Sequence, residues 1–323
     1  MPAGDPSNTR QHYVPQFLLR NFSTGPKHRI FVFDKHTGQV RQQSVSKVAH
    51  ERGFYNWRSE SGEARTIEYR LAKLEHLASK CIGIAIERGS FSGLSHSVRR
   101  MIALFAGVQL SRTPTQRLKL LHTNAIIREE LLKRFGAEAI DTELLRQLKD
   151  FGKEDATKIS IESVLHDSME YAKILLQKHW VLMKTTGNKT LYITDNPVAL
   201  HNWIKRPYRG NLGLKCDGIE VYLPVSSEYV FLFLCPLMAT AWHDASITQG
   251  NLREAENLTH GKSDINDDNV VHLNSIQVGS SERFVYSRDD DFDLVREMLR
   301  EEPHLRMGPR AGLMGKNGEP YPI

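Results

Sequence analysis

The stretch WVLMKTTGNKTLYITDNPVAL, residues 180–200, marks the point where the sequence changes from helical to strand-like patterns. Two apolar runs, 180–183 and 191–193, flank TTGNK, whose glycine and asparagine are typical of a tight turn. This pattern predicts a β-hairpin. Two further runs rich in β-branched and aromatic residues, IEVYLPVS at 219–226 and YVFLFLCP at 229–236, predict two more strands.

Downstream of these strands the pattern alternates between element types. Residues 243–272 are polar and show little apolar periodicity, whereas NVVHLNSIQVG at 269–279 predicts a helix. RFVYS at 283–287 predicts a strand, and DFDLVREMLREE at 291–302 predicts a last helix. We expect residues 303–323 to form a loose tail.

Upstream of Trp180, the chain has a long run of helical patterns. Apolar residues recur with four- and three-residue spacing over 64–88, which predicts a helix with one core-facing stripe. Helices are also predicted over 96–111, from TPTQ at 113–116 onward, and over 141–150 and 161–178, because threonine before proline is a common helix start. Together they predict a helical block over about 64–178.

Near the N-terminus, RIFVFDKHTGQVRQQSV at 29–45 predicts another hairpin, with Gly38 in its turn. Strands joined by short turns favour antiparallel pairing, and helices gathered in one segment favour the α+β class. The sequence therefore predicts an α+β fold, with a mainly antiparallel sheet formed by the N-terminal and C-terminal halves and packed on the central helical block. We expect one domain over 11–302, after a flexible N-terminus at 1–10.

Charge is unevenly distributed along the 323 residues, whose net formal charge is +5. Residues 1–58 carry nine Lys and Arg against three Asp and Glu, and residues 282–302 carry four against eight. A basic face of this kind attracts phosphate, so nucleic acid or a nucleotide is the partner class that the charge favours.

The three cysteines are widely spaced and form no C-x-x-C pair, which fits neither a disulfide framework nor a zinc site. The opening residues do not resemble a secretion signal, and the most apolar run, 101–110, is too short to span a bilayer. We therefore expect a cytoplasmic protein without a membrane segment. No motif for an organic cofactor is evident, and the sequence leaves the oligomeric state open.

Glu68 and Glu75 are seven residues apart on the first predicted long helix, beside its apolar stripe. Neither has a Lys or Arg three or four residues later, so local salt bridges do not account for them. Two carboxylates facing one cavity would ligate Mg²⁺ or Mn²⁺, or act as acid and base. Interhelical ion pairs or solvent exposure are the structural alternatives.

Gln109 lies inside the most apolar helix, and Arg112 follows three residues later. A buried guanidinium needs a carboxylate or a phosphate, since it does not lose its charge. Glu68 and Glu75 are the structural candidates for that partner, and a substrate phosphate is the functional one.

The segment YITDNPV, 192–198, places Asp195 and Asn196 at the end of an apolar run, with Pro197 directing the chain onward. Such a carboxylate would bind a metal or a substrate, or would accept a hydrogen bond from its own backbone in an Asx-turn. His12, in QHYVPQFLLRNF at 11–22, is either a packed histidine or a proton carrier.

The motifs QHYVPQFLLRNF, GFYNW, TIEYRLAKLE, QLSRTP and LYITDNPV resemble, in order and spacing, the bacterial family called domain of unknown function 4238, over about residues 10–290. Thr194 stands where the family pattern leads us to expect serine. The resemblance implies no established activity. It places family signatures on eight residues: His12, Tyr13, Pro15, Glu68, Glu75, Arg112, Asp195 and Asn196.

These residues support two functional hypotheses. The first is a metal-dependent phosphodiesterase or nuclease, of the kind used in bacterial phage defence. Its catalytic residues would be His12, Glu68 and Asp195, its metal ligands Glu68, Glu75 and Asp195, and its substrate contacts Tyr13, Gln109, Arg112 and Asn196. The second is a non-catalytic nucleotide- or partner-binding module in which the same polar residues stabilise the fold.

Overall fold

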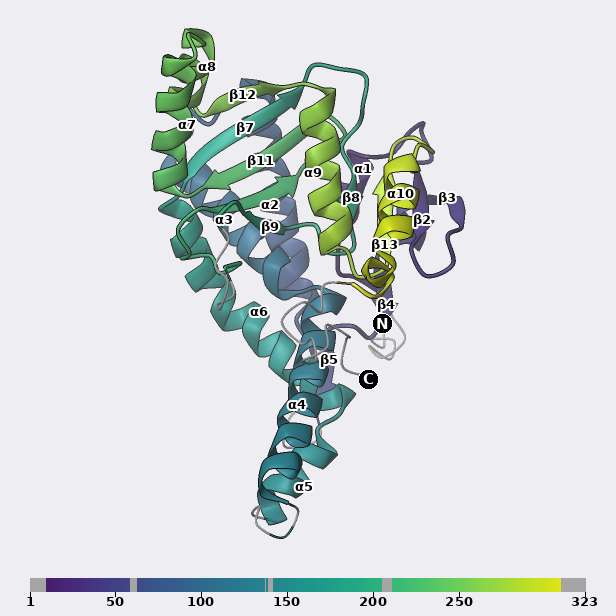
Figure 1. The fold of residues 1–323 in the computed structure, drawn as a ribbon. Coiled ribbons are helices and arrows are strands. Elements are labelled where there is room, and N and C mark those ends of the chain that lie inside the picture. The colour runs from purple at the N-terminus through teal and green to yellow at the C-terminus, as the bar shows by residue number, and fades with distance from the viewer. Residues whose placement is uncertain (1–9, 59–62, 137, 139–141, 205–210, 309–323) are drawn as a thin grey trace.

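The computed structural model describes residues 10–58, 63–136, 138, 142–204 and 211–308. They form helices and mainly antiparallel sheets, which confirms the α+β class. In Figure 1 a twisted sheet has helix α9 (Asp267–Ser280) on one face and helices α2 (Glu68–Arg88) and α3 (His96–Ser111) on the other. Residues 1–9 and 309–323, which belong to the predicted flexible N-terminus and loose tail, lie outside the described residues. Residues 303–307 of that tail form a short 3₁₀ helix.

The larger sheet has five strands, all from the C-terminal half. In spatial order they are β12 (Lys262–Ile265), β7 (His179–Thr185), β11 (Tyr229–Leu234), β10 (Ile219–Pro224) and β9 (Ala199–Asn202). The β12–β7 pair is parallel, and the other three pairs are antiparallel. Strand β10 is buried along its whole length, as expected for a central strand with helices on both faces.

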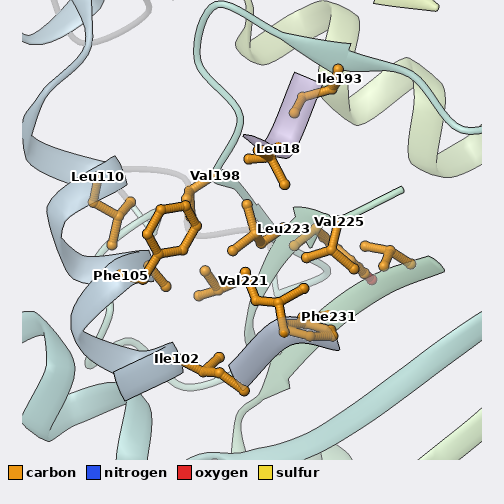
Figure 2. Packing of buried hydrophobic residues seen from close by; sticks show 14 of the residues in the cluster. Leu18, Ile102, Phe105, Leu110, Ile193, Val198, Val221, Leu223, Val225 and Phe231 are labelled. Atoms are coloured by element: carbon orange, nitrogen blue, oxygen red, sulfur yellow. The ribbon is translucent and has the colours of Figure 1, made fainter. Parts of the chain in front are cut away.

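The main core lies between this sheet and α3. Figure 2 shows Phe105 of α3 among side chains of β10 and β11, including Val221 and Phe231. On its other side α3 packs against α6 (Lys153–Leu176) at close range: a Cβ atom added to Gly107 would lie 2.5 Å from the Ser168 carbonyl oxygen. Only glycine permits this approach, so α3 is held between the sheet and α6.

The smaller sheet joins the two ends of the chain. Its order is β3 (Val40–Ser44), β2 (Arg29–Asp34), β13 (Phe284–Ser287) and β8 (Ile193–Thr194). The hairpin predicted at 29–45 is present, and β13 pairs with its first strand. Helix α10 (Asp293–Glu301) packs on this sheet, with the rings of Phe33 and Phe292 5.4 Å apart. The N-terminal and C-terminal halves therefore meet in this sheet.

Two short strand pairs lie near the N-terminal part of the helical block. Strand β1 (Arg10–His12) pairs with β4 (His50–Arg52), and β5 (Asn56–Arg58) pairs with β6 (Ala64–Thr66). A short helix α1 (Gln16–Arg20) follows β1. These elements bring His12 back toward α2.

The helical block is close to the prediction, with two differences. It contains α2, α3, α4 (Pro114–Phe135), α5 (Thr142–Asp150) and α6. Helix α2 begins at Glu68 and not at residue 64, because residues 64–66 pair with β5. Helix α6 begins at Lys153, earlier than the predicted 161, with Asp155 bonding the Gly152 amide at its start.

The hairpin predicted over 180–200 was wrong, since β7 and β8 join different sheets. The side chain of Asn274 holds the segment before β8. Its Oδ1 accepts a hydrogen bond from the Tyr192 amide at 2.8 Å, and its Nδ2 donates to the Thr190 carbonyl at 2.9 Å. An α9 side chain thus binds the backbone on the N-terminal side of β8, while β11 and β12 occupy the two edges of β7.

The region 243–272 was also more regular than predicted. It lies within α7 (Pro236–Thr248), α8 (Leu252–Thr259), β12 and the start of α9. Its low apolar periodicity reflects helices at the periphery of the fold. Among the described residues, no helix has the length and apolar character needed to cross a membrane.

Candidate functional site

The junction between α3 and α4 contains a fully buried charge. Arg112 follows the last turn of α3 and is fully buried. Pro114 opens α4 two residues later, as predicted, so the chain turns at Arg112. This turn directs the guanidinium inward between α3 and α2, where it meets a carboxylate.

Arg112 is held by two side chains. Its Nη1 donates to Glu75 Oε1 at 2.7 Å, and its Nε donates to the Gln109 side-chain oxygen. Glu75 was one of the two carboxylates that the sequence offered as its partner, and this pairing is confirmed. Arg112 Nη2 and Gln109 Nε2 are also buried, and neither has a hydrogen-bond partner in the described part of the chain.

Glu68, the first residue of α2, belongs to the same group. Its Oε2 is buried and has no hydrogen-bond partner among the described residues. Burial and the neighbouring Glu75 carboxylate raise the pKa of Glu68 to about 7, and Arg112 opposes that rise. The Glu68 carboxyl therefore keeps its proton to a higher pH than an ordinary glutamate does.

His12, on β1, interacts electrostatically with Arg112 of this group. Burial, the neighbouring His50 ring and the charge of Arg112 lower the pKa of His12 to about 4. A hydrogen bond to the Val45 backbone raises this pKa but does not outweigh them. The His12 and His50 rings meet edge to face, with centroids 5.3 Å apart. His12 Nε2 is buried without a partner in the described residues, so His12 presents a neutral imidazole at neutral pH. We call His12, Glu68, Glu75, Gln109 and Arg112 the Arg112 cluster.

The GFYNW segment positions the strand that carries His12. The Tyr55 hydroxyl donates to the His12 carbonyl at 3.1 Å, and the Tyr55 amide donates to the Gln11 side chain at 2.5 Å. Tyr55 is buried and interacts electrostatically with Arg112 and Glu75. In the sequence this segment was one motif of the family resemblance, and neither Tyr55 nor Gln11 nor His50 was singled out.

Asp195 lies in a different and fully satisfied environment. Its Oδ1 accepts from the Glu282 amide at 2.8 Å, and its Oδ2 accepts from the Arg283 and Phe284 amides at 2.7 and 2.8 Å. The predicted Asx-turn is therefore not the main use of this carboxylate, because its partners are 87 to 89 residues away. Burial raises the pKa of Asp195, while these amides and the Lys35 ammonium lower it.

Two further polar side chains hold the same region. Asn196 Nδ2 donates to the Ser280 carbonyl at 2.9 Å. Lys35 is fully buried, and its Nζ donates to the Ser281 and Leu305 carbonyls at 2.7 and 2.6 Å. We call Lys35, Asp195 and Asn196 the Asp195 clamp, since together they fix the end of α9 and the start of β13. No sequence pattern singled out Lys35, which lies in the DKHTG turn.

Tyr13 lies between the two groups. It is buried, and its ring packs on Phe54 at a centroid distance of 5.5 Å. Burial and the nearby Asp195 charge raise its pKa. His12 and Tyr13 are adjacent in sequence, yet His12 belongs to the Arg112 cluster and Tyr13 lies near the Asp195 clamp.

The proposed metal set of Glu68, Glu75 and Asp195 is not brought together. Among the described residues there is no group of three His, Cys, Asp or Glu side chains that could hold a metal ion. The oxygens of Asp195 are used by three backbone amides, and Glu75 is paired with Arg112. The proposed catalytic set of His12, Glu68 and Asp195 is divided in the same way.

The fold and this geometry define an α+β protein with two buried polar groups, one fully bonded and one with several unpartnered atoms. The chain belongs to the family described as protein of unknown function (DUF4238), whose model matches residues 10–291. Neither the curated proteins nor the solved structures contain a match to this chain.

Proposed function

We propose that the protein hydrolyses phosphodiester bonds at the Arg112 cluster. One observation carries the proposal: four buried polar atoms of this cluster have no hydrogen-bond partner within the described residues. They are Arg112 Nη2, Gln109 Nε2, Glu68 Oε2 and His12 Nε2. Buried polar atoms are normally bonded, and a group of exceptions is a reason to look for a ligand.

The four atoms suit a phosphate group and the transfer of protons around it. Arg112 Nη2 and Gln109 Nε2 are donors, and a phosphate oxygen is the anionic acceptor that a buried guanidinium favours. The remaining two atoms belong to titratable side chains. A carboxyl and an imidazole with separated pKa values are typical of an acid and a base.

In the proposed reaction a water oxygen attacks phosphorus and gives its proton to neutral His12. The bond between phosphorus and the leaving oxygen breaks, and protonated Glu68 supplies the proton which that oxygen needs. The Glu68 pKa of about 7 and the His12 pKa of about 4 support these protonation states at neutral pH. Arg112 would stabilise the charge that develops on the phosphate.

A divalent cation is a further part of the proposal. Mg²⁺ in proteins is often bound by one or two carboxylates together with substrate phosphates. Glu75 would supply such a carboxylate, and Mg²⁺ or Mn²⁺ would bind together with the substrate. Glu68 is not counted as a ligand in this reaction, because its proton is needed at the leaving oxygen. Asp195 is not included, because its oxygens are bonded to backbone amides.

A non-catalytic nucleotide- or partner-binding module is the second candidate. The pairing of Arg112 with both Glu75 and Gln109 favours it, since such a network also stabilises a fold. For both candidates we propose a cytoplasmic protein. The first has a nucleotide or nucleic acid as its partner and a role in bacterial phage defence, and the second binds a nucleotide or another partner.

A cleavage assay tests the proposal. The full chain is incubated with RNA, single- and double-stranded DNA and dinucleotides, with Mg²⁺ or Mn²⁺ and with EDTA. We expect at least one substrate to be cleaved by the wild type. Glu68→Gln should lower the rate by about 100-fold or more, the usual contribution of a general acid. EDTA separates the metal-assisted from the metal-free form of the proposal.

The matched control is Glu87→Gln, which changes an exposed glutamate near the other end of α2. It should retain the wild-type rate. Absence of cleavage across the panel, or a Glu68→Gln variant as active as Glu87→Gln, would refute the proposal.

A further inference from the structure

A cavity of about 500 Å³ lies beside the junction of α3 and α4, between α6 and the edge strand β9. Its wall includes Leu110 of α3, Ile174 of α6 and Leu200 of β9. None of the residues that line it belongs to the Arg112 cluster. The cavity is therefore a separate site, and a ligand bound there is independent of the proposed hydrolysis.

The charged side chains at this cavity have a single sign. Lys119 and Lys215 line it, and both are exposed to solvent. Among the described residues that line it there is no Asp or Glu. The nearby Glu282 interacts electrostatically with Lys119 but does not line the cavity.

Two other cavities of similar size make this charge distribution informative. One, of about 520 Å³, balances Arg20 and Arg288 with Glu87 and Glu228. Another, of about 490 Å³, is acidic and is lined by four aspartates: Asp267, Asp289, Asp291 and Asp293. Of the three, only the cavity beside the α3–α4 junction offers positive charge without a lining carboxylate among the described residues.

The rest of its lining suits a flat organic ring. Apolar side chains make up most of the wall, and Tyr171 adds an aromatic ring that an aromatic ligand would contact. Gln116 and Asn196 also line the cavity, and the Gln116 amide would add hydrogen bonds to a ligand. A mostly apolar cavity of several hundred Å³ with a few polar groups is typical of a small-molecule site.

We infer that this cavity binds a phosphorylated, ring-bearing ligand of mononucleotide size. The ring lies against the apolar wall and Tyr171, and the phosphate lies at the mouth between Lys119 and Lys215. Two exposed lysines attract phosphate over a distance, and the apolar wall explains why a ring and not a bare anion is expected.

Calorimetric titration of the full chain with AMP, and with adenosine as its uncharged counterpart, tests this inference. We expect AMP to bind at least about tenfold more tightly than adenosine, which corresponds to about 1.4 kcal/mol. The double variant Lys119→Gln, Lys215→Gln should remove that preference and leave adenosine binding unchanged. Higher salt should weaken AMP binding to the wild type.

Lys133→Gln is the matched control, since Lys133 is exposed on the same helix as Lys119 but does not line the cavity. It should bind AMP as the wild type does. Circular dichroism and thermal melting establish that each variant is folded. Equal affinity for AMP and adenosine, no binding of either, or full AMP affinity in the double lysine variant would each overturn the inference.

The outcome is separable from that of the cleavage assay. Glu68→Gln changes the Arg112 cluster alone and should retain AMP binding at the cavity. If the protein cleaves no substrate and still binds AMP through Lys119 and Lys215, the proposed hydrolysis is refuted and the proposed ligand binding at the cavity is supported.

Discussion

The Arg112 cluster and the Asp195 clamp are both buried and charged, but they differ in how completely their atoms are bonded. Both oxygens of Asp195 accept backbone amides, and Lys35 donates to three carbonyls. In the Arg112 cluster four buried atoms lack a partner among the described residues. A satisfied network stabilises a fold, whereas an incomplete one costs stability unless something else completes it.

This contrast assigns different roles to residues that looked alike in the sequence. Asp195 and Glu68 both carry family signatures and both resembled catalytic carboxylates. Their surroundings separate them: Asp195 anchors β13 to the residues that follow β8, and Glu68 retains a buried oxygen without a partner in the described part of the chain. Substitutions and pH titrations in the two regions can sharpen or break the contrast.

The largest effect is expected for Asp195→Asn. The substitution places an amide NH₂ where an oxygen now accepts a backbone N–H, and it removes the negative charge that attracts Lys35. We expect the free energy of unfolding to fall by about 3 kcal/mol, as for other buried charged acceptors. Urea denaturation measures the change.

Asp290→Asn is the control for this experiment, because Asp290 is exposed. It should change stability by less than about 0.5 kcal/mol. If Asp195→Asn unfolds at the same urea concentration as the wild type, the Asp195 clamp is not the structural anchor that its hydrogen bonds indicate.

The second effect is a pH dependence that comes from Glu68. Its pKa is raised in the folded state to about 7, so the folded protein binds this proton more tightly than the unfolded chain does. The resulting stability is present below the ordinary carboxyl pKa and is lost as the pH rises through 7. After allowance for solvent screening, we expect a loss of about 1 kcal/mol between pH 5 and 8.

Urea denaturation of the wild type and of Glu68→Gln at several pH values isolates this contribution. As the pH rises, the wild type should lose stability relative to Glu68→Gln. It should show no such loss relative to Glu87→Gln. A pH-independent difference would place Glu68 in contact with solvent or with an unrecognised partner.

The third effect has the opposite sign and comes from His12. Its pKa is lowered to about 4 in the folded state, so the unfolded chain binds this proton more tightly than the folded protein does. The stability that it contributes is present above the ordinary histidine pKa of 6.5 and is lost as the pH falls toward 4. We expect somewhat less than about 1 kcal/mol after solvent screening.

Comparison of His12→Gln with the wild type between pH 4 and 7 measures this effect. The wild type should lose stability relative to the variant on the acid side. The control is His166→Gln, on the exposed surface of α6, which should show the same pH dependence of stability as the wild type. Parallel curves for His12→Gln and the wild type would show that His12 is accessible to water.

Much of the fold could be predicted because its signals are local. The helix over 96–111 follows from one apolar run, and its bounds match α3. The pairing of Arg112 with Glu75 could be anticipated because a buried guanidinium has few permitted partners. The strands β2, β10, β11 and β13 were recognisable from their β-branched and aromatic residues, and β3 from the turn at Gly38 that precedes it.

The failures came from contacts between distant segments. The hairpin over 180–200 was predicted from its turn residues, but Asn274, more than eighty residues away, binds one of the two segments. The role of Asp195 depends on amides at 282–284, and Lys35 depends on carbonyls near the C-terminal helices. A single sequence carries no local signal for such pairings, so the carboxylates of Glu68 and Asp195 looked equivalent.

The smallest effect is expected for Thr113→Val, which we compare with the same substitution, Thr194→Val, in the other region. Thr113 and Thr194 are both fully buried, and threonine to valine exchanges a hydroxyl for a methyl of similar size. Thr194 Oγ1 is bonded to the Asn196 carbonyl at 3.0 Å and to the Gln277 side chain at 3.2 Å, so Thr194→Val should cost about 1 kcal/mol. Thr113 precedes α4 without capping it, and its Oγ1 has no partner in the described residues. Thr113→Val should therefore leave the urea midpoint unchanged or raise it slightly. Equal losses for the two variants would show that the hydroxyl beside Arg112 is bonded after all, and the contrast between the two regions would then not hold.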